Sequence, residues 1–216
     1  MAEMFRNEPP IDFSRRDNRE RFAQTLEKVR AQFKEQSRKR TTGAWLDSVN
    51  PANPQEVVGR ARVSNTNQAQ EAIERTRRFF PEWRRTTAEE RAEILAKAGR
   101  IMRERRGELA AWEVFEVGKG WREADADVIE AIDYLNYYAG EMIRLARPRQ
   151  TQELPGETNV YFYEPRGIAA IIAPWNFPLA ILTGMTAAAL ASGNCAVIKP
   201  AEQVPVMAPD LMEIFR

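Results

Sequence analysis

The stretch GIAAIIAPWNFPLAILTGMTAAALASGNCAVI, residues 167–198, contains no charged side chain. Prolines, glycines and polar residues interrupt it too often for a membrane span, which needs about 20 consecutive apolar residues. Buried strands flanking a buried helix explain it better, because strands covered on both faces have continuous apolar sequences. We therefore predict strands at 168–173 and 196–199, a helix between them at 180–191, and a helix from residue 207. This order opens a doubly wound parallel sheet in an α/β fold.

The sequence before residue 166 is densely charged, and its apolar residues recur at helical spacing. This periodicity predicts helices over 14–36, 67–83, 107–117 and 122–147. A further helix begins after Thr87, where Thr-Ala-Glu-Glu forms a capping box. Other segments are predicted to be irregular or extended: a turn at 41–43, a short strand around Val57 and Val58, and an aromatic strand at 159–164.

Composition excludes several classes of function. The 32 Lys and Arg residues nearly balance the 31 Asp and Glu residues among 216, which argues against electrostatic binding of nucleic acid. Histidine is absent from the sequence, so histidine-based triads and the commonest metal ligand are excluded. A single cysteine rules out an intrachain disulfide and a cysteine-cluster metal site, and we predict no metal site. The N-terminus lacks the apolar run of a secretory signal, so we expect a cytoplasmic protein that does not enter a membrane.

Two segments follow the predicted strands at their carboxyl ends, where doubly wound sheets bind ligands. In IIAPWNFP, residues 171–178, two prolines and two aromatic residues surround Asn176. An asparagine there can donate to a developing oxyanion, but capping of the next helix is the more frequent role of such a residue. In KPAE, residues 199–202, Lys199 and Glu202 can hold a ribose or form a surface ion pair of little value. No GxGxxG fingerprint is present.

In combination these motifs are specific. IIAPWNFP, a helix of small residues, Gly193-Asn194-Cys195 and then KPAE resemble the aldehyde dehydrogenase superfamily. Four upstream segments resemble its 1-pyrroline-5-carboxylate dehydrogenase branch, also called L-glutamate γ-semialdehyde dehydrogenases: MFRNEPPIDFS (4–14), SVNPANPQEVVG (48–59), EVGK (116–119) and residues 125–138. The resemblance covers nearly the whole chain.

The resemblance implies roles for the segments after both strands. Asn176 would be the catalytic side-chain oxyanion donor. Lys199 and Glu202 would clamp the adenosine ribose and favour NAD over NADP. The wall of the NAD cleft would be formed by Ile172, Pro174 and Trp175.

The same resemblance implies two substrate contacts. Glu130 would face the substrate's amino group, and Phe177 would be an aromatic gate beside the aldehyde. From the residues alone, Glu123, Asp127 and Glu130 share one helix face, for which a solvated acidic stripe is the default interpretation.

The implied reaction is NAD-dependent oxidation of L-glutamate γ-semialdehyde to glutamate in proline degradation, carried out by a longer, homo-oligomeric parent acting on a small aldehyde. The family's nucleophilic cysteine and general-base glutamate would lie outside this sequence, so the chain alone would be inactive, with Cys195 as a small buried residue.

We expect an N-terminal helical part of the NAD-binding domain at 1–148, an oligomerisation-type β-strand segment at 149–167, and the start of the Rossmann-like βαβα unit at 168–216. The alternatives are a non-catalytic truncated fragment and an aldehyde dehydrogenase with another substrate.

Overall fold

The computed structural model describes residues 5–38 and 43–215 of the chain. The turn expected at residues 41–43 falls largely outside these residues. Thirteen elements follow one another along the described chain, and the α/β fold class predicted from the sequence is confirmed. No helix in the described ranges is long and apolar enough to cross a membrane.

The parallel unit predicted from the uncharged stretch is present. Strand β5 (Ile168–Ile172) pairs in parallel with β6 (Cys195–Lys199), and α6 (Ala180–Ala191) connects them. Helix α7 (Met207–Ile214) follows β6. The register places Ile172 opposite Lys199, so both strands end at the same edge.

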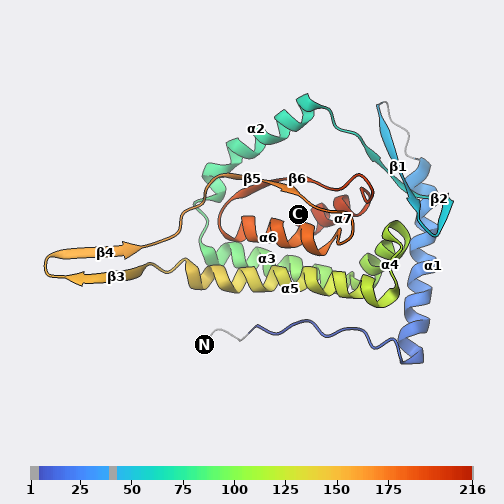
Figure 1. Cartoon of the computed structure of the whole chain (residues 1–216), viewed down its shortest axis with the longest axis horizontal. Helices are drawn as coiled ribbons and strands as arrows, with labels where there is room; N and C mark the ends of the chain where they lie inside the picture. Colours follow the sequence, from blue (N-terminus) through green and yellow to red (C-terminus); the bar gives the residue numbers. More distant parts are fainter. Residues whose placement is uncertain (1–4, 39–42, 216) are drawn as a thin grey trace.

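Helices form one continuous layer beneath this sheet. α3 (Ala88–Glu104) and α5 (Trp121–Leu145) run side by side, and α6 packs on both of them (Figure 1). α4 (Arg106–Val117) closes one end and contacts α1 (Arg16–Arg38). The Thr87 capping box is confirmed, because Glu90 N–H donates to Thr87 Oγ1 at 3.1 Å and Thr87 N–H to Glu90 Oε2 at 2.7 Å.

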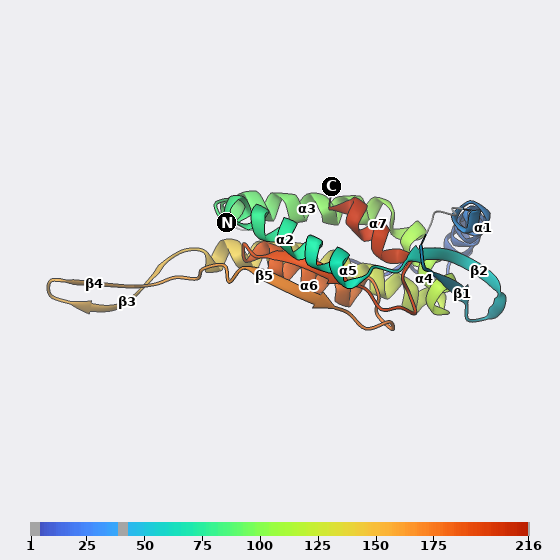
Figure 2. The same cartoon turned by 90° about the horizontal axis from the view of Figure 1, so that it is seen from above.

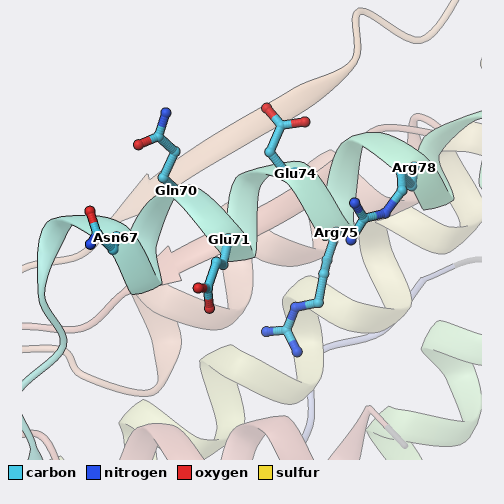
Figure 3. Close-up of a pocket in the computed structure, with 6 residues that line it drawn as sticks. All are labelled: Asn67, Gln70, Glu71, Glu74, Arg75 and Arg78. Atoms are coloured by element: carbon cyan, nitrogen blue, oxygen red, sulfur yellow. The ribbon is translucent and has the colours of Figure 1, made fainter.

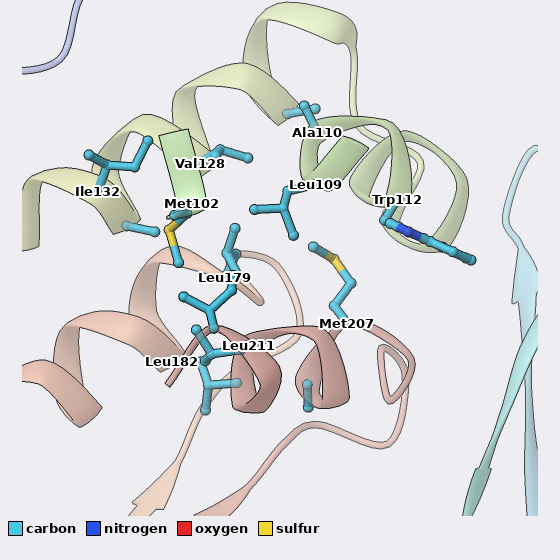
Figure 4. Packing of buried hydrophobic residues seen from close by; sticks show 14 of the residues in the cluster. Met102, Leu109, Ala110, Trp112, Val128, Ile132, Leu179, Leu182, Met207 and Leu211 are labelled. Carbon is cyan, nitrogen blue, oxygen red and sulfur yellow. The ribbon is translucent and has the colours of Figure 1, made fainter. Parts of the chain in front are cut away.

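The core lies where α3, α4, α5, α6 and α7 meet (Figure 4). Each fully buried Leu, Ile or Met stabilises the fold by about 1.5–3 kcal/mol through transfer of apolar surface out of water. The large buried side chains shown there are Met102, Leu109, Trp112, Val128, Ile132, Leu179, Leu182, Met207 and Leu211.

Helix α2 (Thr66–Trp83) lies on the other side of β5 and β6, above the strands in Figure 1 and in front of them in the view of Figure 2. The sequence gives α2 an apolar side, yet none of its residues is buried. Ile73 and Phe79 on that side are exposed by 40% and 49%. The two strands thus have a full layer of helices on one face and only α2 on the other.

Two antiparallel hairpins complete the fold. β1 (Trp45–Asn50) pairs with β2 (Asn53–Arg62), which contains the strand predicted around Val57 and Val58. β3 (Arg149–Leu154) pairs with β4 (Glu157–Tyr161) in a ribbon that projects away from the rest of the molecule (Figures 1 and 2). The aromatic strand expected at 159–164 is therefore one half of a hairpin, and it ends at Tyr161.

Candidate functional site

The carboxyl edge of β5 and β6 carries the residues expected at a cofactor cleft. Ile172 is exposed by 68% at the end of β5, and Trp175 is exposed by 51% in the turn that follows. Pro174 lies exposed between them. The expectation of fully buried strands is wrong, because only Ile171 of β5 and Cys195 of β6 are buried. Large apolar side chains of this exposure at the end of a parallel strand form a surface suited to a flat ring.

Lys199 and Glu202 lie at the same edge, after β6. The Lys199 Nζ is 3.0 Å from Glu202 Oε2, and both side chains are exposed. The pKa of Glu202 is lowered, first by its own backbone N–H and then by the Lys199 ammonium. The Glu202 carboxylate is therefore ionised at neutral pH and can accept hydrogen bonds.

Asn176 lies exposed in the turn between β5 and α6. Its side chain makes no hydrogen bond with the described residues. The helix-cap interpretation of Asn176 is wrong, because α6 begins at Ala180 with Leu179 at the N-cap and has no side-chain cap. The side-chain amide of Asn176 is therefore available to donate a hydrogen bond to a ligand.

A buried ionic cluster holds this turn from beneath. Asp127 Oδ1 on α5 accepts the Ala180 N–H at 2.7 Å, which satisfies a donor at the start of α6. The Lys119 ammonium pairs with Asp127 and with Glu113, whose Oε2 is 2.7 Å from Nζ. Lys119 Nζ also lies 4.7 Å from the centroid of the Phe177 ring, within range of a cation–π contact. The cluster therefore contacts the turn at two points after Asn176, the Phe177 ring and the Ala180 N–H.

This cluster corrects the acidic-stripe interpretation. Asp127 is only 1% exposed, so it is a buried anchor and not a solvated charge. Glu123 is exposed and accepts the Gly120 N–H at 3.1 Å, and Glu130 is exposed farther along α5. Burial, followed by the neighbouring Asp127 charge, raises the pKa of Glu113 well above its usual range. The Glu113 carboxyl group therefore holds a proton more tightly than a solvent-exposed glutamate does, although the Lys119 ammonium opposes this effect.

Glu130 borders a groove of about 560 Å³ between α5 and the extended N-terminal segment. The Tyr134 hydroxyl donates to Glu130 Oε1 at 2.9 Å. Asp133 accepts from Asn7 Nδ2 at 2.8 Å and from the Glu8 N–H at 2.9 Å, which fixes the segment along the helix. The lining residues are Phe5, Asn7, Glu8, Pro10, Ala126, Ile129, Glu130, Asp133, Tyr134 and Tyr137.

A second hollow lies on α2 (Figure 3). Its six lining side chains all come from this one helix and carry both signs of charge, so nothing encloses a ligand. They are Asn67, Gln70, Glu71, Glu74, Arg75 and Arg78.

The single cysteine lies at the opposite end of the strands from Asn176. Cys195 pairs with Ile168 at the start of both strands and is 5% exposed. A five-residue strand spans roughly 13–17 Å at about 3.3 Å per residue, which is too far for attack beside Asn176. Burial raises the pKa of the Cys195 thiol, as expected of a small packed residue. Among residues 5–38 and 43–215, no group of metal-ligating side chains gathers to hold an ion.

These features fit one class of protein, and comparison with known proteins identifies it. Residues 38–216 match the model of the Aldehyde dehydrogenase family. The chain belongs to the aldehyde dehydrogenase family.

Within the family, similarity concentrates in one branch. Over its whole length the chain is 42% identical to 1-pyrroline-5-carboxylate dehydrogenase of Geobacillus thermodenitrificans, and it covers 43% of that protein. It superposes with a TM-score of 0.92 on 1-pyrroline-5-carboxylate dehydrogenase from Thermus with bound NAD, at 40% identity, covering 99% of this chain and 43% of that one. Proline utilization A from Bdellovibrio bacteriovorus gives a TM-score of 0.92 at 40% identity, covering 98% of this chain and 23% of that one. The chain thus spans less than half the length of the curated relatives that it matches.

Proposed function

We propose that this chain provides the cofactor edge and the oxyanion donor of an NAD-dependent aldehyde dehydrogenase that oxidises L-glutamate γ-semialdehyde to glutamate in proline degradation. One observation supports it above all: Asn176 and the Lys199–Glu202 pair follow the carboxyl ends of two paired parallel strands, in a chain 42% identical to a 1-pyrroline-5-carboxylate dehydrogenase. The boundaries proposed are 1–148 for the N-terminal part of the NAD-binding domain, 149–167 for the oligomerisation segment and 168–216 for the start of the βαβα unit.

The residues at the carboxyl edge fit NAD. The ionised, exposed Glu202 carboxylate can accept from both ribose hydroxyls, and its charge opposes a 2′-phosphate. Lys199 would hold the ribose beside it, while Ile172, Pro174 and Trp175 would form the apolar wall. When bound, NAD accepts the hydride released from the aldehyde carbon.

Three residues of this chain would contact the substrate. The Asn176 amide donates a hydrogen bond to the aldehyde oxygen as negative charge develops on it, and such a donor is most effective in a water-excluded site. Phe177 borders the aldehyde from the same turn, and its ring rests on Lys119. The Glu130 carboxylate attracts the substrate ammonium, which favours an amine-bearing aldehyde over other substrates.

The β3–β4 hairpin is proposed to pair with another copy of the parent protein. Val160, Tyr161, Phe162 and Tyr163 are exposed by 44–58% on or directly after β4. An aromatic ribbon with free edges is stabilised by further strand pairing, which supports a homo-oligomer.

The test uses a fusion of this chain to the part of the Geobacillus thermodenitrificans relative that lies beyond the matched region. NADH formation is measured with L-glutamate γ-semialdehyde, with other small aldehydes, and with NADP in place of NAD. We expect turnover of the semialdehyde with NAD, and none by the chain alone because its one cysteine is buried away from Asn176. Asn176→Ala in the fusion should lower kcat by about 10²–10³.

Asn67→Ala, an exposed asparagine on α2, is the matched control and should leave kcat unchanged. Preference for an aldehyde without an amino group would favour the alternative substrate. Equal activity of the Asn176→Ala and Asn67→Ala fusions would remove Asn176 from the mechanism.

A further inference from the structure

Tyr134 makes a contact that no role assigned so far requires. Its hydroxyl lies one helical turn from Glu130 on α5 and donates to Glu130 Oε1 at 2.9 Å. A bond to one carboxylate oxygen fixes the rotamer of a side chain that is otherwise exposed and mobile. The second oxygen, Oε2, is left to accept from a ligand.

The ring of Tyr134 is itself held in place. A Cβ at Gly184 on α6 would lie 2.8 Å from the ring, so the tyrosine packs directly on the glycine backbone. On its other side the ring stacks on Tyr138, with centroids 5.7 Å apart and planes 6° from parallel. The hydroxyl therefore has little freedom, and Glu130 is fixed relative to α6 as well as to its own helix.

Charge in the groove leaves Glu130 as a carboxylate suited to an incoming cation. Glu8 is neutralised by Arg103, whose guanidinium contacts both of its oxygens at 2.9–3.0 Å. Asp133 is occupied by two N–H donors of the N-terminal segment. Glu130 has no Lys or Arg partner among the described residues, and Tyr134 is the donor that fixes it.

We infer that Tyr134 is a positioning residue that orients the Glu130 carboxylate toward the ammonium group of an amine-bearing aldehyde and thereby sets the preference for it. This inference rests on the proposed function, because it names how the amino group is selected at that site. The pKa of Tyr134 is raised, first by the bond to Glu130 and then by burial, so the hydroxyl stays a donor at neutral pH.

The kinetic test compares two substrates that differ only in the amino group. L-glutamate γ-semialdehyde and 5-oxopentanoate are assayed with the fusion protein, its Tyr134→Phe variant and its Tyr138→Phe variant. Tyr134→Phe should lower the kcat/KM ratio of the amine-bearing to the amine-lacking aldehyde by about 3- to 10-fold, through KM, since one hydrogen bond is lost. Tyr138→Phe removes the hydroxyl of another half-buried tyrosine on α5, one that makes no bond to Glu130, and should leave the ratio unchanged.

A double-variant cycle separates positioning from simple packing. Glu130→Gln alone should lower the ratio further than Tyr134→Phe does. Adding Tyr134→Phe to Glu130→Gln should then change little, because the two residues act through one contact. Equal ratios for Tyr134→Phe and Tyr138→Phe, or fully additive effects in the cycle, would overturn the inference. A wild-type fusion that prefers 5-oxopentanoate would instead overturn the proposed function.

A second measurement needs no turnover and uses the chain itself. Tyrosinate absorbance is followed against pH in the unmodified chain and in the Glu130→Gln and Tyr134→Phe variants. Two tyrosines of the unmodified chain should ionise late, Tyr134 and Tyr161, because the pKa of each is raised by a side-chain hydrogen bond. Tyr134→Phe should remove one of the two late ionisations and leave that of Tyr161, and Glu130→Gln should shift the Tyr134 ionisation to lower pH. If Glu130→Gln leaves the tyrosine titration unchanged, Tyr134 does not position Glu130.

Discussion

The starts of α6 and α7 perform the same structural task by different means. Each helix follows one strand of the parallel pair, and neither has a side-chain cap of its own. A buried carboxylate from a distant helix accepts the first N–H groups instead. Asp127 accepts from Ala180 at 2.7 Å, and Glu116 accepts from Val206 at 2.7 Å and Met207 at 3.1 Å.

The difference lies in what balances each carboxylate. Asp127 has the Lys119 ammonium, whereas the donors to Glu116 within residues 5–38 and 43–215 are neutral and include the Ser48 hydroxyl at 2.9 Å. Burial raises the pKa of Glu116 to about 7, against the lowering effect of the Val206 N–H. A buried carboxylate can thus anchor a helix with or without a cation, and without one its burial moves the pKa of Glu116 toward neutral pH.

The largest effect on stability is expected when the Lys119 ammonium is removed from Asp127, because Asp127 then has no cation among the described residues, as Glu116 has none. Lys119→Met leaves Asp127 as a buried charge without its partner, which costs about 3–5 kcal/mol of unfolding free energy. Urea denaturation of the chain measures it. A loss below about 1 kcal/mol would mean that the helix N–H groups alone stabilise the Asp127 carboxylate.

Changing pH should separate the two anchors. Glu116 binds its proton more tightly in the folded state than in the unfolded state, where its pKa is near the ordinary 4.5. The contribution of Glu116 to the free energy of unfolding therefore falls as pH rises from about 4.5 to about 7, by on the order of 3 kcal/mol, and this contribution is level outside that window. Urea denaturation from about pH 5 to about pH 8 checks this.

Glu116→Gln is the control for the pH prediction, because it keeps an oxygen acceptor and cannot ionise. Asp210, in the first turn of α7, contributes with the same sign, since burial raises its pKa despite the Arg105 partner. Asp210 is intact in the variant, so the difference between wild type and variant isolates Glu116. Parallel pH curves would show that Glu116 does not titrate in this window.

The smallest effect is expected at the exposed ion pair. Lys199→Met removes the partner of Glu202 at the end of β6, where both side chains are in water. Solvent screening makes such pairs nearly neutral for stability, so the urea midpoint should not move measurably. A shift approaching that of Lys119→Met would mean that the carboxyl edge is not the solvent-exposed surface described here.

The parallel unit could be predicted from sequence because its signal is local. An uncharged stretch punctuated by Pro178 and Gly193 predicted α6 with the bounds observed and β5 and β6 within one residue of them. The residue pattern did not mark β3, because its six residues are all exposed and show no alternation of burial; only the resemblance implied a β-strand segment at 149–167. β1 was missed for a related reason, since its few buried positions are polar.

Site residues likewise divide into those that local sequence indicates and those that depend on a contact distant in sequence. The placement of Asn176 and Glu202 at the strand ends could be predicted, because each comes directly after a predicted strand in the sequence. The role of Asp127 does not, because its partner Ala180 is 53 residues away and helical spacing alone grouped Asp127 with exposed acids. A signal was present nonetheless. It appears once the structure excludes Asn176 as a cap, because the first N–H groups of α6 then require an acceptor from elsewhere.

The reactivity of the Cys195 thiol reports local unfolding of the protein around it. Its thiol is buried where β6 starts, and no other cysteine occurs in the sequence. An alkylating reagent therefore reacts only when the parallel pair or the end of α6 separates from its neighbours. When the open state closes faster than the reagent reacts with it, the labelling rate is proportional to the equilibrium constant for opening. The measurement needs no engineered label.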